Sequence, residues 1–291
     1  MEVKDIFAQA TRNLTALQDS LRRLEKTIQP STKAALLIGI NYAGTKSELK
    51  GCINDVQAVE RMLVDVYHFK PENILSLTDA PDKTKTTYAG ILKGLRWLVQ
   101  KNREGCSSLW FHYSGHGTHI ADRSRDERDG RDECIIPSDF KLISDDLLFT
   151  NLVAPLSTGT RLVGFMDCCH SGTQLDLKYR YIAGQRTVIE HSRQTSKAAV
   201  IILSGCKDPQ TSADAFFKDE GWSGAMTKYL LEVLQEAEYN ITCYNILRKL
   251  RAKLRTNKFV QIPQLTCSRP VSGATVFSAH REPGVAAYVS T

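Results

Sequence analysis

The sequence predicts an α/β fold in which a central, mostly parallel β-sheet is covered by helices on both faces. Short apolar runs rich in β-branched and aromatic residues alternate with amphipathic segments from residue 33 onward. Strand and helix alternating at this spacing are typical of parallel crossovers buried on both sides. The chain has 291 residues, of which 42% are hydrophobic and 24% charged, so it is long enough to bury a large core.

The N-terminal segment predicts a separate amphipathic helix. Within residues 3–28, apolar residues recur every seven positions from Phe7 to Ile28, with further apolar residues between them. This is the a/d seam of about three heptads. It divides the chain into an N-terminal helical segment, 1–32, and a larger domain, 33–291. We expect this helix either to be a self-association or regulatory prodomain or to pack on the chain's own larger domain.

The strands and helices of the larger domain follow in order. Six apolar runs predict strands, which cover residues 34–40, 73–78, 108–114, 161–167, 198–205 and 264–268. Five segments predict helices, which cover residues 54–66, 84–101, 144–156, 223–236 and 241–256. Asn54 and Ser144 are the expected N-caps. Residues 178–197 are polar, basic and weakly periodic, which predicts a long surface loop, and loops of that length tend to be functional or cleavable.

Composition argues against several classes of partner. The formal net charge is +6, but the 38 basic residues are interleaved with 32 acidic ones, so we expect no nucleic-acid site. No apolar run approaches the ~18 residues of a membrane span, and the N-terminus lacks the layout of a signal peptide. The eight cysteines are irregularly spaced, which is typical of free thiols in a reducing compartment. We therefore expect a cytoplasmic protein without membrane contact.

Two predicted strands end in residues suited to nucleophilic catalysis. His116 follows the strand 108–114, and Cys169 follows the strand 161–167. Reactive groups of parallel sheets lie just beyond the carboxyl ends of strands, and an imidazole there can activate a thiol. The backbone amide of Gly117 can face a developing oxyanion.

Two cysteines are adjacent at the end of the strand 161–167. Side chains alternate along a strand, so Asp167 and Cys169 share one face while Cys168 points into the core. Cys169 lies 53 positions after His116, close to the ~50 that separate His from Cys in caspase-type peptidases.

These motifs resemble those of one peptidase family. HYSGHG followed by DCCHSG is similar to the signature pair of metacaspases, the caspase-like peptidases of plants, fungi and protists. Further segments agree in order, namely GCIND (51–55), DGRDECIIPSD (129–139), the Asp145-Asp146 pair, SGCKDPQTSADA (204–215) and QIPQL (261–265). The likeness covers about residues 33–280. It implies a caspase-like (caspase-hemoglobinase) fold and a cysteine endopeptidase in which Cys169 is the nucleophile and His116 the base.

The resemblance also implies a specificity pocket formed by Cys52, Asp55, Ser114 and Asp167. Two carboxylates in a desolvated cleft repel each other, and a guanidinium or ammonium group relieves that repulsion. The implied substrates are polypeptides with Arg or Lys before the scissile bond. Caspases line this pocket with arginine, so their substrates should be rejected. The alternative for Asp55 is an acidic residue favoured by a helix N-terminus.

A calcium site is implied in the same way. Four aspartates match the family's calcium ligands, Asp132, Asp145, Asp146 and Asp176. Hard oxygen ligands suit calcium better than zinc, and an affinity of ~10⁻⁴ to 10⁻³ M would switch activity off at resting calcium. Asp126 or Asp129 can substitute for Asp132, and the alternative is a solvated acidic loop.

Self-processing is a further hypothesis. Four basic residues of the predicted loop fit a pocket selective for basic side chains, namely Arg180, Arg186, Arg193 and Lys197. Cleavage would be triggered by calcium. As in the family, we expect a monomeric catalytic domain.

Other functions have less support in the sequence. A zinc hydrolase using His112, His116 and His119 lacks a glutamate at the required position, and the flanking glycines argue against a helix; His112 and His119 are expected in a strand and a loop. A calcium-sensing or oligomerising scaffold is opposed by the intact Cys169 and His116. A vicinal-thiol redox switch would require a strained disulfide.

Overall fold

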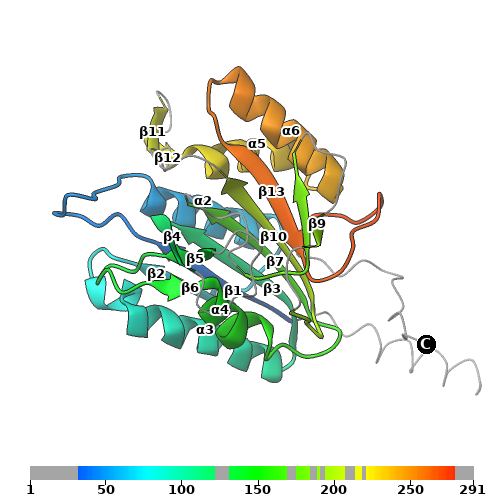
Figure 1. Cartoon of the computed structure of the whole chain (residues 1–291), viewed down its shortest axis with the longest axis horizontal. Helices are drawn as coiled ribbons and strands as arrows, with labels where there is room; N and C mark the ends of the chain where they lie inside the picture. Colours follow the sequence, from blue (N-terminus) through cyan, green and yellow to red (C-terminus); the bar gives the residue numbers. More distant parts are fainter. Residues whose placement is uncertain are drawn as a thin grey trace, which may run out of the picture. The chain divides into compact units, whose positions relative to one another are not determined.

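A computed structural model of the chain describes most of the larger domain (Figure 1). The described residues are 32–121, 131–168, 175–183, 189–190, 194–206, 214–217 and 221–278. The expected heptad helix of residues 3–28 lies outside them, as does Cys169.

The domain is built on an eight-stranded sheet with the strand order β2-β1-β3-β7-β10-β13-β8-β9. The strands are β1 (Thr32–Gly39), β2 (Ile74–Thr78), β3 (Cys106–Ser114), β7 (Arg161–Asp167), β8 (Tyr179–Ile182), β9 (Ile189–Glu190), β10 (Ala199–Cys206) and β13 (Ile262–Cys267). β1 pairs in parallel with β2, and β7 pairs in parallel with both β3 and β10. β13, β8 and β9 continue the sheet in antiparallel order. The predicted mostly parallel sheet is confirmed.

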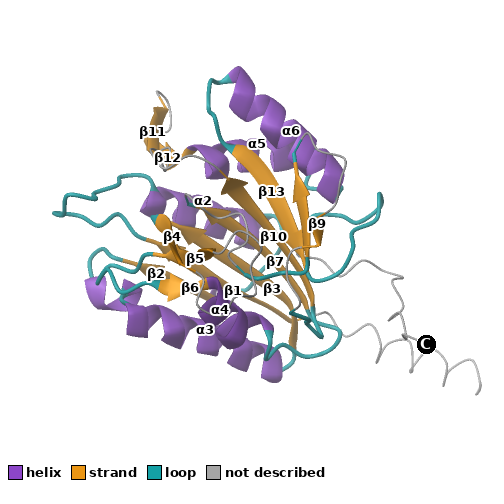
Figure 2. Cartoon of the chain, in the orientation of Figure 1, coloured by secondary structure: helices purple, strands orange, loops and turns teal. Residues whose placement is uncertain are grey.

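Helices cover both faces of this sheet (Figure 2). They are α2 (Cys52–Asp65), α3 (Tyr88–Arg103), α4 (Asp145–Leu148), α5 (Ala225–Glu236) and α6 (Cys243–Thr256), with short η1 (Pro71–Asn73) and η2 (Lys83–Thr86). The π-helical turn η3 (Phe149–Val153) extends α4. Apolar residues of α2, α5 and α6 pack into one core cluster, and those of α3, α4 and η3 pack into the other.

The alternation of side chains along the strands supplies both cores. In β7, Val163 and Phe165 belong to the cluster of α2, α5 and α6, whereas Leu162 and Met166 belong to the cluster of α3 and α4. Each central strand is apolar on both faces, which explains why these strands appear as continuous hydrophobic runs in the sequence.

Several strands were not predicted. β4 (Gly117–Ala121), β5 (Arg131–Ile135) and β6 (Ile143–Ser144) form a small sheet, and β11 (Asp214–Phe217) pairs with β12 (Gly221–Gly224). His119 therefore lies in a strand and not in a loop. These segments are short and polar, so their pairing is set by tertiary contacts rather than by hydrophobic period.

The prediction that residues 178–197 form one surface loop is wrong in part. β8 and β9 lie inside this range, and β8 pairs along β13. Tyr181 is buried and packs in the core cluster of α5 and α6. One face of β8 is thus apolar. The strand is too short for this hydrophobic pattern to stand out in the sequence among the basic residues around it.

The helix caps are partly as expected. Ser144 caps α4, since its hydroxyl accepts a hydrogen bond from Leu147 N at 3.4 Å. Asn54 is not a cap: α2 begins at Cys52, and Asn41 Oδ1, from the loop after β1, accepts from Cys52 N at 3.0 Å. Asn54 instead donates to Trp222 O at 2.8 Å. A cap that comes from a distant segment leaves no local pattern in the helix itself.

Two structural findings bear on the composition. Six cysteines of the described residues are buried thiols outside any disulfide, namely Cys52, Cys106, Cys134, Cys168, Cys243 and Cys267. Among the helices that the structure describes, none combines the length and the hydropathy that crossing a membrane requires.

Candidate active site

The ends of β3 and β7 bring the two predicted catalytic segments together. The strands pair in parallel with Ser114 opposite Asp167, and Gly115 N donates to Asp167 O at 3.3 Å. His116 stands two residues beyond Ser114, and Cys169 stands two residues beyond Asp167. Neighbouring strand ends therefore carry the imidazole and the segment of the predicted nucleophile.

The His116 ring is held in a defined orientation. Its Nε2 lies 2.8 Å from Ser47 O, and its backbone N donates to Tyr42 Oη at 3.0 Å. The two rings, those of Tyr42 and His116, lie 4.7 Å apart between centroids. A carbonyl oxygen only accepts, so Nε2 carries the ring proton and Nδ1 is the nitrogen able to accept one.

The glycine after His116 begins a strand. Gly117 is the first residue of β4 and lies opposite Ile135 of β5. The carbonyl of His116 accepts from Tyr113 Oη at 2.7 Å and from Ile136 N at 3.1 Å. These bonds fix the backbone around the imidazole, while the oxyanion role of Gly117 stays a prediction.

The two cysteines of the pair differ as strand geometry requires. Cys168 is buried and packs in the cluster of α3 and α4, whereas Asp167 faces α5. The prediction that Cys168 is a core residue pointing away from Asp167 is confirmed.

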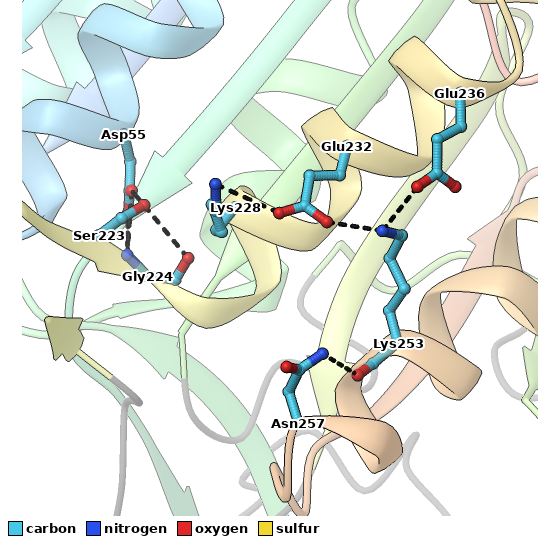
Figure 3. A network of polar contacts seen from close by, with 8 residues as sticks. All are labelled: Asp55, Ser223, Gly224, Lys228, Glu232, Glu236, Lys253 and Asn257. Carbon is cyan, nitrogen blue, oxygen red and sulfur yellow. Dashed lines mark hydrogen bonds and ion pairs between the residues drawn. The ribbon is translucent and has the colours of Figure 1, made fainter. Parts of the chain in front are cut away.

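Asp55 is the centre of a polar network at the predicted specificity pocket (Figure 3). Its carboxylate is fully buried and accepts from Ser114 Oγ at 2.7 Å and from Ser223 Oγ at 2.6 Å. Gly224 N donates to both carboxylate oxygens, at 3.0 and 3.1 Å. β3, α2 and β12 therefore meet at this one side chain.

Asp167 lies beside Asp55 in the same network. Its Oδ2 accepts from Thr227 N at 2.8 Å and from Thr227 Oγ1 at 2.9 Å, at the first turn of α5. A Cβ placed on Gly224 would lie 2.2 Å from Asp167 Oδ2 and 2.7 Å from Asp55 Oδ2. Gly224 thus separates the two carboxylates, and only glycine fits there without displacement of its neighbours.

The pKa of Asp55 is raised to about 7, by burial first and by the neighbouring Asp167 second. Hydrogen bonds from Ser223, Ser114 and Gly224 oppose this change. Two carboxyl groups in so little water resist being ionised together. A positive charge placed between two such carboxyl groups would favour their ionised forms.

The remaining pocket residue, Cys52, is also enclosed. It is 4% exposed and is the first residue of α2. This helix packs so closely on β1 that a Cβ at Gly39 would lie 2.5 Å from Cys52 O. The structure thus brings together Asp55, Ser114 and Asp167 through direct contacts or strand pairing, and places Cys52 on the same helix one turn before Asp55.

The four predicted calcium ligands lie on neighbouring segments. Asp132, Asp145 and Asp176 are buried, at 6%, 2% and 2% exposure. Asp145 Oδ2 accepts from Glu133 N at 2.9 Å, which ties α4 to β5. Asp132 and Asp145 both lie near the Cys134 thiol, whose pKa is raised to about 12 by burial first and by these carboxylates second.

Asp146 and Asp176 share one partner. Gln194 Nε2 donates to Asp146 Oδ1 at 3.2 Å and to Asp176 Oδ2 at 2.5 Å. The oxygen donors fit calcium in type. As arranged, however, no three His, Cys, Asp or Glu side chains of the described residues form a group ready to hold a metal ion. Asp126 and Asp129, the alternatives to Asp132, lie outside the described residues.

The proposed cleavage positions have different settings. Arg180 lies in β8, where it pairs with Thr266 of β13. Lys197 is exposed, and its carbonyl accepts from Arg269 Nη2 at 2.7 Å. Arg186 and Arg193 lie outside the described residues. Since a peptidase binds its substrate in an accessible segment, Arg180 inside a sheet is less suited to cleavage than the exposed Lys197.

The histidine pattern does not form a metal centre. His112 lies in β3 as predicted, fully buried and stacked on Phe165 at 5.3 Å, with Nδ1 3.1 Å from Phe165 O. Burial lowers the pKa of His112 to about 4, so it is a neutral core residue. It faces the core, whereas His116 lies beyond the strand.

Sequence reasoning missed four residues of these sites: Tyr42, Gln194, Ser223 and Thr227. Each contributes a hydroxyl or amide from a segment distant in sequence from its partner. Such residues carry no local signal in the sequence.

Fold and site together define a class of protein. A sheet flanked by helices, with an imidazole and a cysteine-bearing segment at adjacent strand ends and a carboxylate pair beside them, is the arrangement of caspase-fold cysteine peptidases. Solved structures agree on the fold. An insect caspase-1 from Spodoptera frugiperda is similar with a TM-score of 0.51 and 13% identity, over 81% of this chain and 86% of that chain. A protein from Geobacter sulfurreducens, GSU0716, gives a TM-score of 0.60 and 21% identity, over 86% of this chain and 100% of that chain.

Sequence relatives narrow the class to one family. The family profile described as "Metacaspase, peptidase C14 domain" matches residues 33–178. Metacaspase-1B of Neurospora crassa is 35% identical over 84% of this chain and 68% of its own length. The chain belongs to the metacaspase family of cysteine peptidases, and the predicted resemblance and caspase-like fold are confirmed.

Proposed function

We propose that this metacaspase is a calcium-dependent endopeptidase that cleaves polypeptides after Arg or Lys and processes its own chain. The observation that carries the proposal is the buried pair Asp55 and Asp167 beside the strand ends of the catalytic segments. The family implies polypeptide substrates; the pair supports a positively charged residue before the scissile bond.

The chemistry follows from the orientation of His116. Its Nε2 faces Ser47 O, so Nδ1 takes the proton of the Cys169 thiol as the thiolate attacks the scissile carbonyl carbon. The C–N bond breaks, His116 returns the proton to the leaving amine, and a thioester remains. Water, deprotonated by the same imidazole, then hydrolyses the thioester and restores the thiol. The backbone N–H of Gly117 stabilises the oxyanion.

A basic substrate side chain competes with internal donors in the pocket. Asp55 already accepts from Ser114, Ser223 and Gly224. A guanidinium or ammonium group replaces neutral donors with charged ones, which are roughly twice as strong. A carboxylate in the same position would add a third negative charge, so caspase substrates with Asp are rejected.

Calcium binding at the cluster of Asp132, Asp145, Asp146 and Asp176 is proposed as the activating event. Three of these carboxylates are almost fully buried, and burying several carboxylates together is costly without a cation. When bound, calcium would neutralise their mutual repulsion. Self-processing is proposed between residues 183 and 198, where Lys197 offers an exposed side chain.

A peptide assay tests the proposal. Matched fluorogenic peptides ending in Arg, Lys and Asp are incubated with wild type and with Cys169→Ala across a calcium titration, and intact mass follows self-cleavage. We expect calcium-dependent release from the Arg and Lys peptides only, and new fragments only in wild type. Equal cleavage of the Asp peptide, or activity that survives in Cys169→Ala, would contradict the assignment. Activity unaffected by chelation would remove the calcium part alone.

A calcium-sensing scaffold without activity is tested by the same experiment. It predicts calcium binding with no peptide cleavage at any calcium concentration. The oriented imidazole of His116 supports the peptidase instead.

A further inference from the structure

We propose that the Gln194 side chain closes the acidic cluster when no cation is bound, and that cation binding displaces Gln194 and loosens the segment 194–197. This inference rests on the proposed calcium dependence and adds to it a specific residue that couples the cluster to the processing segment.

The contact is specific in chemistry and in geometry. A side-chain amide nitrogen carries two hydrogens, and Gln194 Nε2 places one toward Asp146 Oδ1 and one toward Asp176 Oδ2, at 3.2 and 2.5 Å. Because a carboxylate oxygen only accepts, the amide must present its nitrogen and not its oxygen. The NH₂ group therefore supplies partial positive charge between two negative groups.

A cation and this nitrogen compete for one position. Calcium binds carboxylate oxygens at ~2.3–2.6 Å, a distance similar to that from Nε2 to Asp176 Oδ2. Two groups cannot occupy the same place between Asp146 and Asp176. Calcium binding there would therefore break both hydrogen bonds of Gln194.

The position of Gln194 in the chain gives the displacement a consequence. It lies between two of the basic residues proposed for self-cleavage, Arg193 and Lys197. Beyond it the chain is fixed, since Arg269 Nη2 donates to Lys197 O at 2.7 Å and Ala198 O accepts from Ser268 Oγ at 2.9 Å. Gln194 is thus the side chain that anchors the segment to the acidic cluster, on the N-terminal side of a fixed point.

Calcium affinity measured without catalysis tests the inference. Full-length Cys169→Ala protein is titrated with calcium by calorimetry, with and without Gln194→Ala. Removal of the competing amide is expected to tighten calcium binding about tenfold, which corresponds to ~1.4 kcal/mol. Gln194→Met, of similar length but without a donor, should behave as Gln194→Ala and covers the case in which the alanine variant folds poorly. Gln100→Ala is the matched control, because Gln100 bonds only Glu104 on the surface of α3.

Limited trypsin digestion supplies a second readout. Calcium should speed cleavage at the basic residues flanking Gln194 in the Cys169→Ala parent, and Gln194→Ala should be cut fast even in chelator. Unchanged or weaker calcium affinity in Gln194→Ala would overturn the inference, since it would make Gln194 a bystander or a ligand through its oxygen. If the parent binds no calcium, the inference fails together with the proposed calcium dependence. Cleavage of Arg peptides by wild type would still test the peptidase assignment separately.

Discussion

Replacing Asp55 by asparagine should stabilise the protein at neutral pH while removing its activity on basic substrates. Burial and the neighbouring Asp167 raise the pKa of Asp55 from 3.8 to about 7. Between these two values the folded protein holds a proton that the unfolded chain has released. The free energy of unfolding of wild type therefore falls as the pH rises through this window.

The magnitude follows from the same pKa difference. At ~1.4 kcal/mol per pKa unit, ionising Asp55 costs the folded state about 4 kcal/mol at pH 8. Asparagine has nearly the same shape and does not ionise: its oxygen can accept from Gly224 N and one serine hydroxyl, while its NH₂ group donates to the hydroxyl oxygen of the other serine. The stability of Asp55→Asn relative to wild type should thus increase by about 4 kcal/mol between pH 4 and pH 8.

Urea unfolding at pH 4, 6 and 8 measures this change. Asp82→Asn serves as a control, because hydrogen bonds from Thr84 lower the pKa of Asp82 in the folded protein. The stability of this variant relative to wild type should therefore change with pH in the opposite direction. A stability difference between Asp55→Asn and wild type that stays constant with pH would refute the reasoning. In the peptide assay, loss of the charge should lower kcat/KM for the Arg substrate about 100-fold. For wild type, KM should fall as the pH rises through about 7, and Asp55→Asn should lack this dependence.

Three further substitutions test the site and its surroundings. Tyr42→Phe removes the hydroxyl that accepts from His116 N and should lower kcat about tenfold with KM unchanged. The control Tyr244→Phe should leave kcat unchanged. An equal loss of kcat in both variants would exclude a positioning role for Tyr42. Gly224→Ala places a Cβ between the pocket carboxylates, so kcat/KM for Arg peptides should fall at least ~10-fold, while Gly273→Ala, with open space around it, is the control measured in parallel. Lys253→Ala breaks ion pairs with two glutamates of α5, at 2.6 and 2.8 Å (Figure 3). It should lower the free energy of unfolding by about 0.5–1 kcal/mol, measured by thermal unfolding, and leave kcat/KM unchanged. A change in specificity would show that α6 is coupled to the pocket.

The central sheet could be predicted from sequence because its strands are buried on both faces. Runs such as AALLIGI are short and apolar throughout, which is typical of strands buried on both faces, and the positions of Asp167 and Cys168 on opposite faces follow from the two-residue period of a strand. The prediction that Asn54 is an N-cap was wrong because the actual partner comes from another part of the chain. The donors at the start of α2 are satisfied by Asn41, which is distant in the chain, so local propensity gave a plausible but wrong partner.

Polar site residues were predictable only where a motif carries them. His116 and Asp167 follow apolar strands and stand out against them, whereas Ser223 and Thr227 are common residue types in a polar context. Their roles depend on β12 and α5 reaching the ends of β3 and β7, which is a property of the fold. β8 was missed because Tyr181 provides its only deeply buried side chain, too little for a hydrophobic period.

The two acidic sites of this domain are built on one physical principle. In each, buried or partly buried carboxylates accept hydrogen bonds from neutral donors of the same chain, which are Ser223 and Gly224 at Asp55 and Gln194 at Asp146 and Asp176. The hydrogen bonds from these neutral donors offset part of the cost of removing the carboxylates from water, but they compensate only part of the negative charge. Under the proposed function, a basic substrate side chain at one site and a calcium ion at the other would each replace a weaker donor with a stronger one. We expect each exchange to displace the donors that now hold the carboxylates, which belong to β12 at one site and to the segment 194–197 at the other, so cation binding would be coupled to movement of that segment.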